Sequence, residues 1–319
     1  MRTALGLGII IALMSVNILF AGEQVLRIIF GIQGSENGQF YCPGRIATDD
    51  SGNLYVADYG NDRVQKYNEL GVCVLQWGDS GNGNGQFSRP SGIAIDSMGC
   101  IYVSDSANDR IQKFDKNGAY LSHWGSRGKE DGRFHSPTGL AFDSEDNLYV
   151  VDTNNHRIQK FDKKSAFLSS FGSSGSKDGQ FYYPEGIAID SSDIIYVADT
   201  LNNRVQKFDK DGVFYAKLGS FGSSPGEFYY PTAIGLRENR EIVVADSGNN
   251  RVQTFSSEGV FLSEWGSRGT NDLQLDWPIG LAFDKNGNIF VSDSGNSRML
   301  VYNYKKENMP VYFNKQIKP

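Results

Sequence analysis

The chain has 319 residues, a formal net charge of −6 at pH 7, 39% hydrophobic residues and 21% charged residues. This apolar content is typical of a folded globular protein and excludes a chain that is disordered throughout. The isoelectric point near 5.2 argues against nucleic acid or an anionic membrane surface as a partner, because both require a basic patch.

The first 22 residues differ in composition from the rest of the chain. One basic residue, Arg2, precedes an apolar run that ends at Phe20 and is followed by two small residues. This order is typical of a secretory signal, although the cleavage signature is imperfect and the run is short for a membrane span. Residues 1–22 are predicted to be a cleaved signal peptide, with an uncleaved N-terminal anchor as the alternative. Both place residues 23–319 outside the cytoplasm, in a secreted or periplasmic location.

Residues 24–30 are the next apolar segment, and they have the composition of a β-strand. The segment stands alone before the repeated part of the chain. Its final Phe30 and the following Gly31 lie 47 residues before Trp77 and Gly78. This spacing makes the segment equivalent to the last strand of a repeat.

The rest of the sequence repeats with a period of 47 residues. Prolines recur with this step at positions 43, 90, 137, 184, 231 and 278. Six units follow one another without an insertion or a linker. The repeat therefore predicts one domain at residues 23–304, followed by a tail at residues 305–319.

Each unit holds four short apolar runs that have strand composition. In the second unit these runs are residues 92–96, 101–105, 110–114 and 120–124. They are rich in β-branched and aromatic residues and are bounded by turn residues, and no long window shows helical periodicity. Four antiparallel strands in each of six units predict an all-β, six-bladed β-propeller.

The ring of blades must also close, and the last unit supplies only three strands before residue 304. We predict that residues 24–30 complete the sixth blade, which hides two sheet edges and joins the two ends of the domain. Residues 311–313, with the sequence Val-Tyr-Phe, are the competing candidate for this edge.

The motif Asp-x-x-Asn-x-Arg recurs in every unit, between the second and third strands. Asp and Asn suit a tight turn, and an arginine can bridge a carboxylate and nearby carbonyl groups. A ligand rarely needs six copies of one group around a ring, whereas every blade needs the same brace. We therefore assign structural roles to Asp58, Arg63, Asp105, Arg110, Asp152, Arg157, Asp199, Arg204, Asp246, Arg251, Asp293 and Arg298.

The full pattern of a unit is Pro-x-Gly-Ile-Ala-Ile-Asp followed by Ile-Tyr-Val-x-Asp-Ser-x-Asn-x-Arg-Ile-Gln-Lys-Phe. This pattern resembles the NHL repeat. The resemblance covers all six units, roughly residues 24–304, and it implies a six-bladed β-propeller. It does not imply one activity, because the family includes binding modules, RNA readers and a few enzymes.

Function is expected where the units differ from one another. The two residues before each repeated proline end the loops between blades near the mouth of the central channel, and four of these six pairs carry aromatic rings. Aromatic rings with a few charges suit peptides or sugars, although such rings also pack against adjacent loops. The candidate ligand-binding residues, taken from these pairs and from other departures from the repeat, are Tyr41, Arg45, Tyr59, Tyr182, Tyr183, Glu185, Tyr229, Tyr230 and Trp277.

Catalytic interpretations have less support in the sequence. The peptidyl-hydroxyglycine lyases, an NHL-like class, bind a metal through several histidines in the central cavity. Here His135 and His156 lie in one unit and His123 lies in an outer strand, so the three do not come from separate blades around the channel. Glu185 and Asp276 are the carboxylates available for a calcium site of the kind found in six-bladed lactonases.

The sequence therefore favours an exported, non-catalytic propeller that binds a protein, peptide or glycan on the face bearing the loops between blades. Neither a cofactor nor a metal is expected, and no catalytic residue is identified. Nucleic acid is not an expected partner, and the membrane is contacted only through residues 1–22 if they stay attached. The alternative is a metal-dependent hydrolase or lyase that acts at the mouth of the channel.

Overall fold

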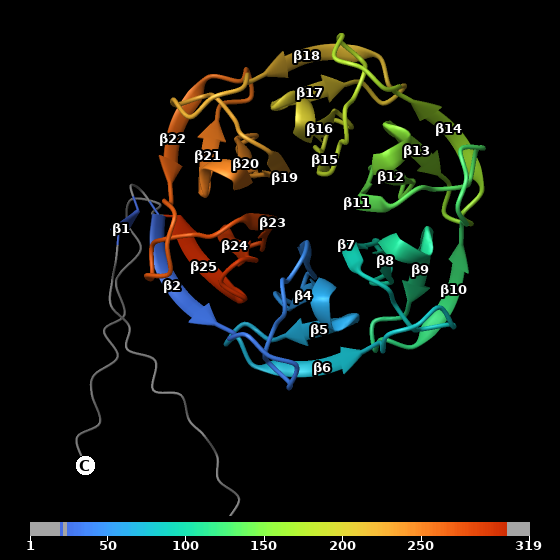
Figure 1. The fold of residues 1–319 in the computed structure, drawn as a ribbon, viewed down its shortest axis with the longest axis horizontal. Helices are drawn as coiled ribbons and strands as arrows, with labels where there is room; N and C mark the ends of the chain where they lie inside the picture. Colours follow the sequence, from blue (N-terminus) through green and yellow to red (C-terminus); the bar gives the residue numbers. More distant parts are fainter. Residues whose placement is uncertain (1–19, 22–23, 305–319) are drawn as a thin grey trace, which may run out of the picture.

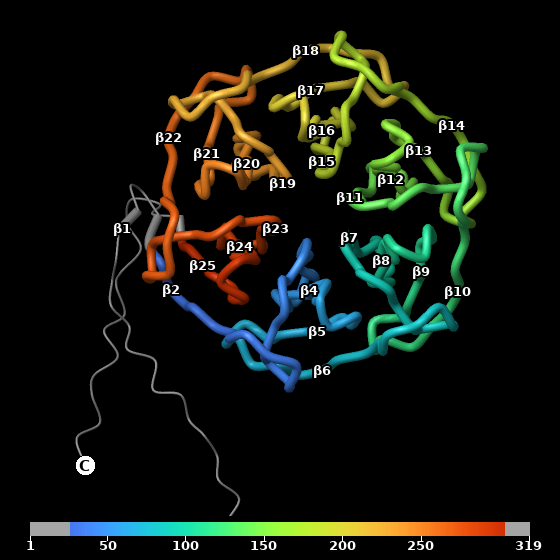
Figure 2. Tube along the Cα trace, in the orientation of Figure 1, coloured from blue at the N-terminus to red at the C-terminus, as the bar shows by residue number. Residues whose placement is uncertain are grey.

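Six antiparallel sheets form a ring around a central axis in the computed structural model, which describes residues 20–21 and 24–304 (Figure 1). Each sheet is one blade. The chain runs from an inner strand beside the axis to an outer strand at the rim, and then returns to the inner strand of the next blade (Figure 2). The predicted all-β, six-bladed propeller is confirmed.

The first three blades each hold four strands in chain order. Blade 1 consists of β3 (Ile46–Thr48), β4 (Leu54–Asp58), β5 (Arg63–Tyr67) and β6 (Cys73–Trp77). Blade 2 consists of β7 (Pro90–Ile95), β8 (Ile101–Asp105), β9 (Arg110–Phe114) and β10 (Tyr120–Trp124). Blade 3 consists of β11 (Pro137–Phe142), β12 (Leu148–Asp152), β13 (Arg157–Phe161) and β14 (Phe167–Phe171).

The last three blades follow the same order, apart from the end of blade 6. Blade 4 consists of β15 (Ile187–Ile189), β16 (Ile195–Asp199), β17 (Arg204–Phe208) and β18 (Phe214–Leu218). Blade 5 consists of β19 (Pro231–Leu236), β20 (Ile242–Asp246), β21 (Arg251–Phe255) and β22 (Phe261–Trp265). Blade 6 begins with β23 (Pro278–Phe283), β24 (Asn288–Asp293) and β25 (Arg298–Tyr304).

Blade 6 is completed by the beginning of the described chain. Strand β2 (Gln24–Phe30) pairs antiparallel with β25, with Phe30 opposite Met299. The predicted closure by residues 24–30 is confirmed, and the competing residues 311–313 lie outside the described residues. A short strand, β1 (Phe20–Ala21), pairs with β2 and extends this sheet by one strand.

Short 3-10 turns join the second and third strands of five blades. These turns are η1 (Tyr59–Asn61), η2 (Ser106–Asn108), η3 (Thr153–Asn155), η4 (Thr200–Asn202) and η5 (Ser247–Asn249). Among the described residues, no helix has the length and apolar character needed to cross a membrane.

The hydrophobic core is divided into clusters that lie between neighbouring blades. One cluster joins Tyr55 and Val64 of blade 1 to Ile93 and Phe114 of blade 2. Because blades pack face to face, the second strands are buried along their whole length, as in β8. Each fully buried apolar side chain of this kind stabilises the fold by roughly 1.5–3 kcal/mol.

The loops between blades insert one apolar side chain each into these clusters. In the loop before blade 2 this residue is Phe87, which is fully buried and lies with its ring centroid 5.5 Å from that of Phe114. Gly78, with φ of +96°, packs so closely that a Cβ would come within 2.5 Å of the Phe87 ring. Glycine is thus required for both the backbone angle and the contact.

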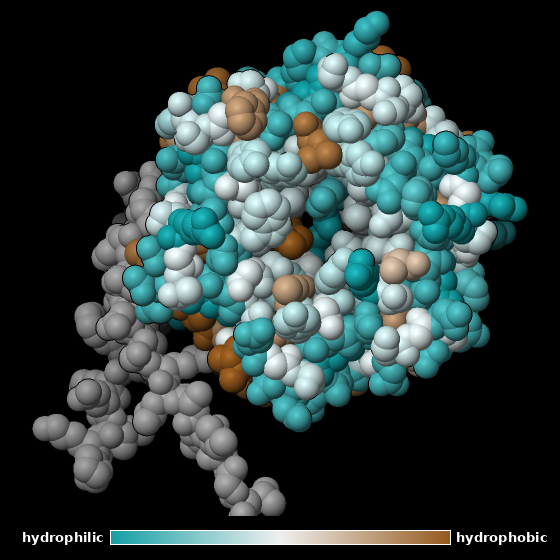
Figure 3. Space-filling model, in the orientation of Figure 1, coloured by the Kyte–Doolittle hydropathy of each residue, from teal (hydrophilic) through white to brown (hydrophobic). Residues whose placement is uncertain are grey.

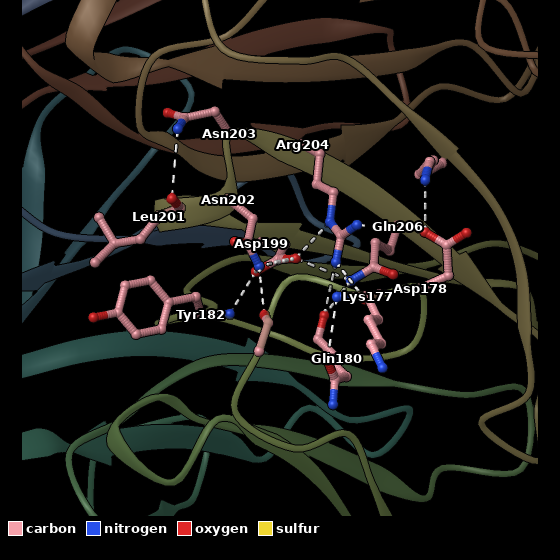
Figure 4. A network of polar contacts seen from close by, with 12 residues as sticks. Lys177, Asp178, Gln180, Tyr182, Asp199, Leu201, Asn202, Asn203, Arg204 and Gln206 are labelled. Atoms are coloured by element: carbon pink, nitrogen blue, oxygen red, sulfur yellow. Dashed lines mark hydrogen bonds and ion pairs between the residues drawn. The ribbon is translucent and has the colours of Figure 1, made fainter.

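The Asp-x-x-Asn-x-Arg motif ties each of these loops to its own blade, as Figure 4 shows for blade 4. Arg204 Nε donates to the fully buried Asp199 carboxylate at 2.7 Å. The Arg204 guanidinium also donates to the Lys177 and Gln180 carbonyl oxygens of the loop, at 2.8 and 2.9 Å. Asn202 donates to a third loop carbonyl, so one motif fixes most of the loop.

The same ion pair is formed in all six blades. The distance from arginine Nε to the aspartate Oδ2 lies between 2.7 and 2.8 Å in every copy, and each aspartate is fully buried. A buried carboxylate is tolerated only when it is paired and hydrogen-bonded. The motif therefore recurs because each blade uses this ion pair to hold the loop that precedes it.

Candidate functional site

The two residues before each repeated proline have the same backbone arrangement in the different blades. In blade 5, the Tyr229 N–H donates to Asp246 Oδ1 at 2.7 Å, and its carbonyl accepts from Gly248 N–H at 2.8 Å. The next residue, Tyr230, donates its N–H to Asn203 Oδ1 of blade 4 at 3.0 Å. The pair is therefore anchored to its own blade and to the preceding one.

The second residue of each pair lies in the left-handed backbone region. The φ angles fall between 49° and 56° at Cys42, Arg89, Ser136, Tyr183, Tyr230 and Trp277. This conformation costs a non-glycine residue about 1–2 kcal/mol, and the surrounding hydrogen bonds hold it in place. The same backbone thus presents six pairs of side chains, five of which differ in composition.

Four side chains of blades 5 and 6 form a continuous row of ring contacts, which we call the aromatic row. The ring centroids of Phe221 and Tyr229 are 5.7 Å apart, those of Tyr229 and Tyr230 are 4.6 Å apart, and those of Tyr230 and Trp277 are 5.9 Å apart. Phe221, Tyr229 and Trp277 are 70%, 39% and 41% exposed. The row is therefore both ordered by its own contacts and open to solvent.

A glycine fixes the orientation of one ring in this row. A Cβ built on Gly248 would come within 2.4 Å of Tyr229 Cδ1, so the ring lies against the backbone of η5. Blade 1 repeats this contact between Tyr41 and Gly60. Blade 4 carries Leu201 at the equivalent position, and there Tyr182 stacks on a histidine instead.

Tyr182 and Tyr183 form a separate group with His156 of blade 3. The His156 and Tyr182 rings stack with centroids 5.5 Å apart, and Tyr183 N–H donates to His156 Nδ1 at 3.0 Å. Burial lowers the pKa of His156 from its ordinary value, and the charges of Asp199 and Asp152 oppose this shift. The neutral imidazole is therefore the form that fits this site.

Arg45 and Glu185 lie in the central channel and pair with each other. Arg45, in blade 1, is 8% exposed, and its Nη2 lies 3.0 Å from Glu185 Oε2 of blade 4. The same guanidinium donates to Ser91 Oγ at 2.9 Å and to the Thr232 carbonyl at 3.0 Å. One side chain thus links four blades across the channel, whose opening is narrow in Figure 3.

The channel beside Arg45 is small, and aliphatic side chains form most of its wall. A cavity of about 90 Å³ lies there, and each blade contributes one aliphatic side chain to its wall, namely Ile46, Ile93, Leu140, Ile187, Ile234 and Leu281. Arg45 stands where four other units have glycine and one has alanine, so its neighbours leave room for a long side chain. The positive charge opposes the binding of a cation at this place.

Tyr41 and Tyr59 lie at a fourth place, a hollow between blades 1 and 2. Its volume is about 380 Å³, and its lining residues are Tyr41, Cys42, Tyr59, Gly60, Asp62 and Arg89. The nine candidate residues therefore occupy the aromatic row, the His156 group, the channel and this hollow. Among the described residues, no ring contact joins one of these places to another.

Phe221 and Arg89 were not among the residues predicted for the site. The signal was present in the repeat, because Phe221 stands where the other units have Gln, Ser or Arg. Phe221 lies outside the pairs of residues beside the prolines, whereas Arg89 belongs to one of these pairs. Phe221 lies in the same loop but ten residues before Pro231.

The histidines have partners of their own. His123 contacts the Tyr120 hydroxyl at 2.6 Å, and His135 lies 3.5 Å from an Arg127 nitrogen. Across residues 20–21 and 24–304, no three histidine, cysteine, aspartate or glutamate side chains are grouped as metal ligands. Neither His135 with His156 nor Glu185 with Asp276 is joined by a third such group among these residues.

Two models of known protein families match different parts of the repeated sequence. An NHL-repeat model matches residues 40–67, 87–114 and 134–161, and a model described as a 6-bladed beta-propeller matches residues 183–294. No curated protein matches the sequence.

Several solved structures share the fold at low sequence identity. A virginiamycin B lyase from Staphylococcus aureus is 14% identical with a TM-score of 0.61, over 88% of this chain and 99% of that one. A gluconolactonase from Xanthomonas campestris is 15% identical with a TM-score of 0.65, over 88% and 91% of the two chains. A Bacteroides thetaiotaomicron protein of unknown function is 15% identical with a TM-score of 0.67, over 88% and 76%.

These likenesses concern the fold alone, because the identities are so low. The period of 47 residues, the six closed blades and the two family models agree with one another. The chain contains NHL repeats and folds as a six-bladed β-propeller.

Proposed function

We propose that this protein is an exported, non-catalytic propeller that binds a protein, peptide or glycan through the face bearing the loops between blades. The observation that carries the proposal is the aromatic row of Phe221, Tyr229, Tyr230 and Trp277. Tyrosine and tryptophan are enriched among the residues that dominate binding energy, because they combine a large apolar area with a polar group.

The backbone beneath the aromatic row supports this proposal. Tyr229, Tyr230 and Trp277 have their N–H groups held by Asp246, Asn203 and Asn250, at distances of 2.7 to 3.0 Å. A surface that is already ordered loses little conformational entropy when a ligand binds. The rings therefore need little rearrangement to accept the apolar face of a sugar or a peptide side chain.

The alternative function is a metal-dependent hydrolase or lyase at the mouth of the channel. Its support is that a lyase and a gluconolactonase are among the solved propellers of similar fold. In this chain Arg45 crosses the channel and pairs with Glu185, so a cation bound there would have to compete with a guanidinium. This geometry favours the binding function.

A binding screen with matched variants tests the proposal. The full chain is applied to glycan and peptide arrays, and any ligand found is titrated against the wild type, Trp277→Ala and Tyr230→Ala. Tyr215→Ala is the control, because Tyr215 is 71% exposed on the outer strand β18 and takes no part in the ring contacts of the aromatic row. We expect at least a tenfold loss of affinity in the first two variants and none in the control.

Two results would count against a binding function at this place. One is an array on which the wild type and the Trp277→Ala variant capture the same ligands equally well. The other is a metal-dependent turnover of a lactone or ester that survives both aromatic substitutions. Export is tested separately, by the mass of the protein recovered outside the cytoplasm, which shows whether residues 1–22 have been removed.

A further inference from the structure

The contact between blades 1 and 2 differs from several other contacts between blades. In three other blades a hydroxyl group that follows the motif aspartate donates to the proline carbonyl of the next blade. These bonds run from Ser106 Oγ to Pro137 O at 2.5 Å, from Thr200 Oγ1 to Pro231 O at 2.8 Å, and from Ser247 Oγ to Pro278 O. In blade 1 the equivalent residue is Tyr59.

The hollow of about 380 Å³ lies beside Tyr59. This volume is within the range of about 300–1,000 Å³ that is usual for small-molecule sites. The side chain that breaks the repeat is therefore also one of those that line the hollow. A second wall is Tyr41, whose ring is set by its contact with Gly60 and whose N–H donates to Asp58 Oδ1 at 2.9 Å.

Arg89 supplies a positive charge to this hollow. Its backbone is fixed, because φ is 56° and its N–H donates to Asp62 Oδ1 at 2.7 Å. Its exposed guanidinium forms no hydrogen bond or ion pair with the described part of the chain, residues 20–21 and 24–304. Arginine presents a planar set of donors that matches a carboxylate.

We propose that this hollow binds a sugar acid, with the sugar ring against Tyr41 and Tyr59 and its carboxylate paired with Arg89. Two phenol rings suit the face of a pyranose, and their hydroxyl groups suit its polar edge. Asp62 places a negative charge beside Arg89, so the site accepts a monoanion better than a doubly charged phosphate. The site is distinct from the aromatic row and does not depend on it.

A titration with D-galacturonate tests this proposal, with D-galactose as the uncharged probe. The full chain is titrated by calorimetry and by NMR, in the wild type and in three variants. Arg89→Gln removes the charge, Tyr59→Ser restores a residue found at this position in other units, and Trp277→Ala alters only the aromatic row. A thermal melt of each variant confirms that it is folded.

We expect saturable binding of D-galacturonate that is at least tenfold tighter than binding of D-galactose. Arg89→Gln and Tyr59→Ser each lower the affinity at least tenfold, and Trp277→Ala leaves it unchanged. Equal binding of the two sugars overturns the pairing with Arg89. Absence of saturable D-galacturonate binding, or unchanged binding in folded Tyr59→Ser, overturns the site as a whole.

Discussion

The motif aspartates and the residues beside the prolines lie next to each other in every blade, yet they behave in opposite ways. In blade 5, Asp246 is fully buried and its carboxylate holds the backbone of Tyr229. The Tyr229 side chain itself is 39% exposed. The aspartate is the same in all six units, whereas the residue it holds is tyrosine, serine, histidine or aspartate. The repeated residues therefore form the structural frame of the propeller. The varying residues are the side chains that this frame holds in its loops.

Departures from the repeat are of two kinds in this molecule. Arg45 and Glu185 depart from their units but satisfy each other inside the channel. Phe221 and Trp277 of the aromatic row depart from their units and are exposed, as is Arg89. A residue that differs from the repeat but pairs with another residue inside the protein is interpreted as part of the frame. A residue that differs from the repeat and is exposed is a candidate for ligand recognition.

Removing the buried ion pair of the repeated motif is expected to have the largest effect on the free energy of unfolding. Arg251→Ala removes the ion pair with the buried Asp246 carboxylate, formed at 2.7 Å, and bonds to the loop carbonyls of Ser224 and Glu227. The free energy of unfolding should fall by about 3–5 kcal/mol, because a buried charge is left without its partner. Urea unfolding followed by tryptophan fluorescence measures this change.

The control for this measurement is an exposed ion pair. Arg133 lies 3.8 Å from Glu130, and both side chains are more than half exposed. Arg133→Ala should change the free energy of unfolding by less than about 1 kcal/mol. Similar losses in Arg251→Ala and Arg133→Ala would show that the repeated motif does not brace the frame.

The pair in the channel should have an intermediate effect. Arg45→Met removes the bonds to Glu185, Ser91 and Thr232, and we expect the free energy of unfolding to fall by about 2 kcal/mol. Glu185 is partly exposed, so its carboxylate retains some contact with water and the loss is smaller than in the buried brace.

A double-mutant cycle separates this pairing from general loss of packing. If Arg45 and Glu185 stabilise each other, Glu185→Gln should cost much less in the Arg45→Met background than in the wild type. Additive losses in the double variant would mean that the two charges act independently, and the pair would then not belong to the frame.

His156 provides a smaller effect that depends on pH. Because burial lowers the folded-state pKa of His156 below the unfolded value of about 6.5, folding favours the neutral form that accepts the Tyr183 N–H. This contribution is present above pH 6.5 and is lost as the pH falls through the folded-state pKa. Its size should be below about 1 kcal/mol, because the half-buried site is screened by solvent.

His156→Asn is the matched variant, since Asn203 and Asn250 accept the equivalent bond in the next two blades. Thermal unfolding measured from pH 7.5 to pH 5 should show an extra loss of stability in the wild type that the variant lacks. Parallel pH profiles of the two proteins would rule out the contribution of this hydrogen bond.

The sequence was sufficient to predict the frame because each frame residue is repeated. The period of 47 residues identified the blades, and the same spacing assigned residues 24–30 to blade 6. The pairing of β1 with β2 is not predicted from the sequence, because Phe20 and Ala21 belong to residues 1–22, whose composition predicts a signal peptide.

The arrangement of the candidate residues was harder to predict for a physical reason. Arg45 and Glu185 are 140 positions apart and meet only because a long side chain crosses the channel between opposite blades. The sequence around either residue does not indicate that their side chains meet. Likewise, the separation of Tyr41 and Tyr59 from the aromatic row depends on where six blades lie around a ring. The binding roles of these residues stay predictions.

The smallest effect on stability is expected when a residue of the aromatic row is substituted. Tyr230→Gly relieves a left-handed backbone angle of 54°, which costs a tyrosine about 1–2 kcal/mol. It also removes the ring contacts to Tyr229 and Trp277, worth about 0.5–1.5 kcal/mol each. The two changes nearly cancel, so the free energy of unfolding should move by less than about 1 kcal/mol while ligand binding at the aromatic row is lost. Loss of binding without loss of stability would show that Tyr230 serves ligand binding and does not stabilise the fold. A loss of several kcal/mol would instead place Tyr230 in the frame, because its two ring contacts, offset by the relieved backbone strain, are too weak to account for such a loss.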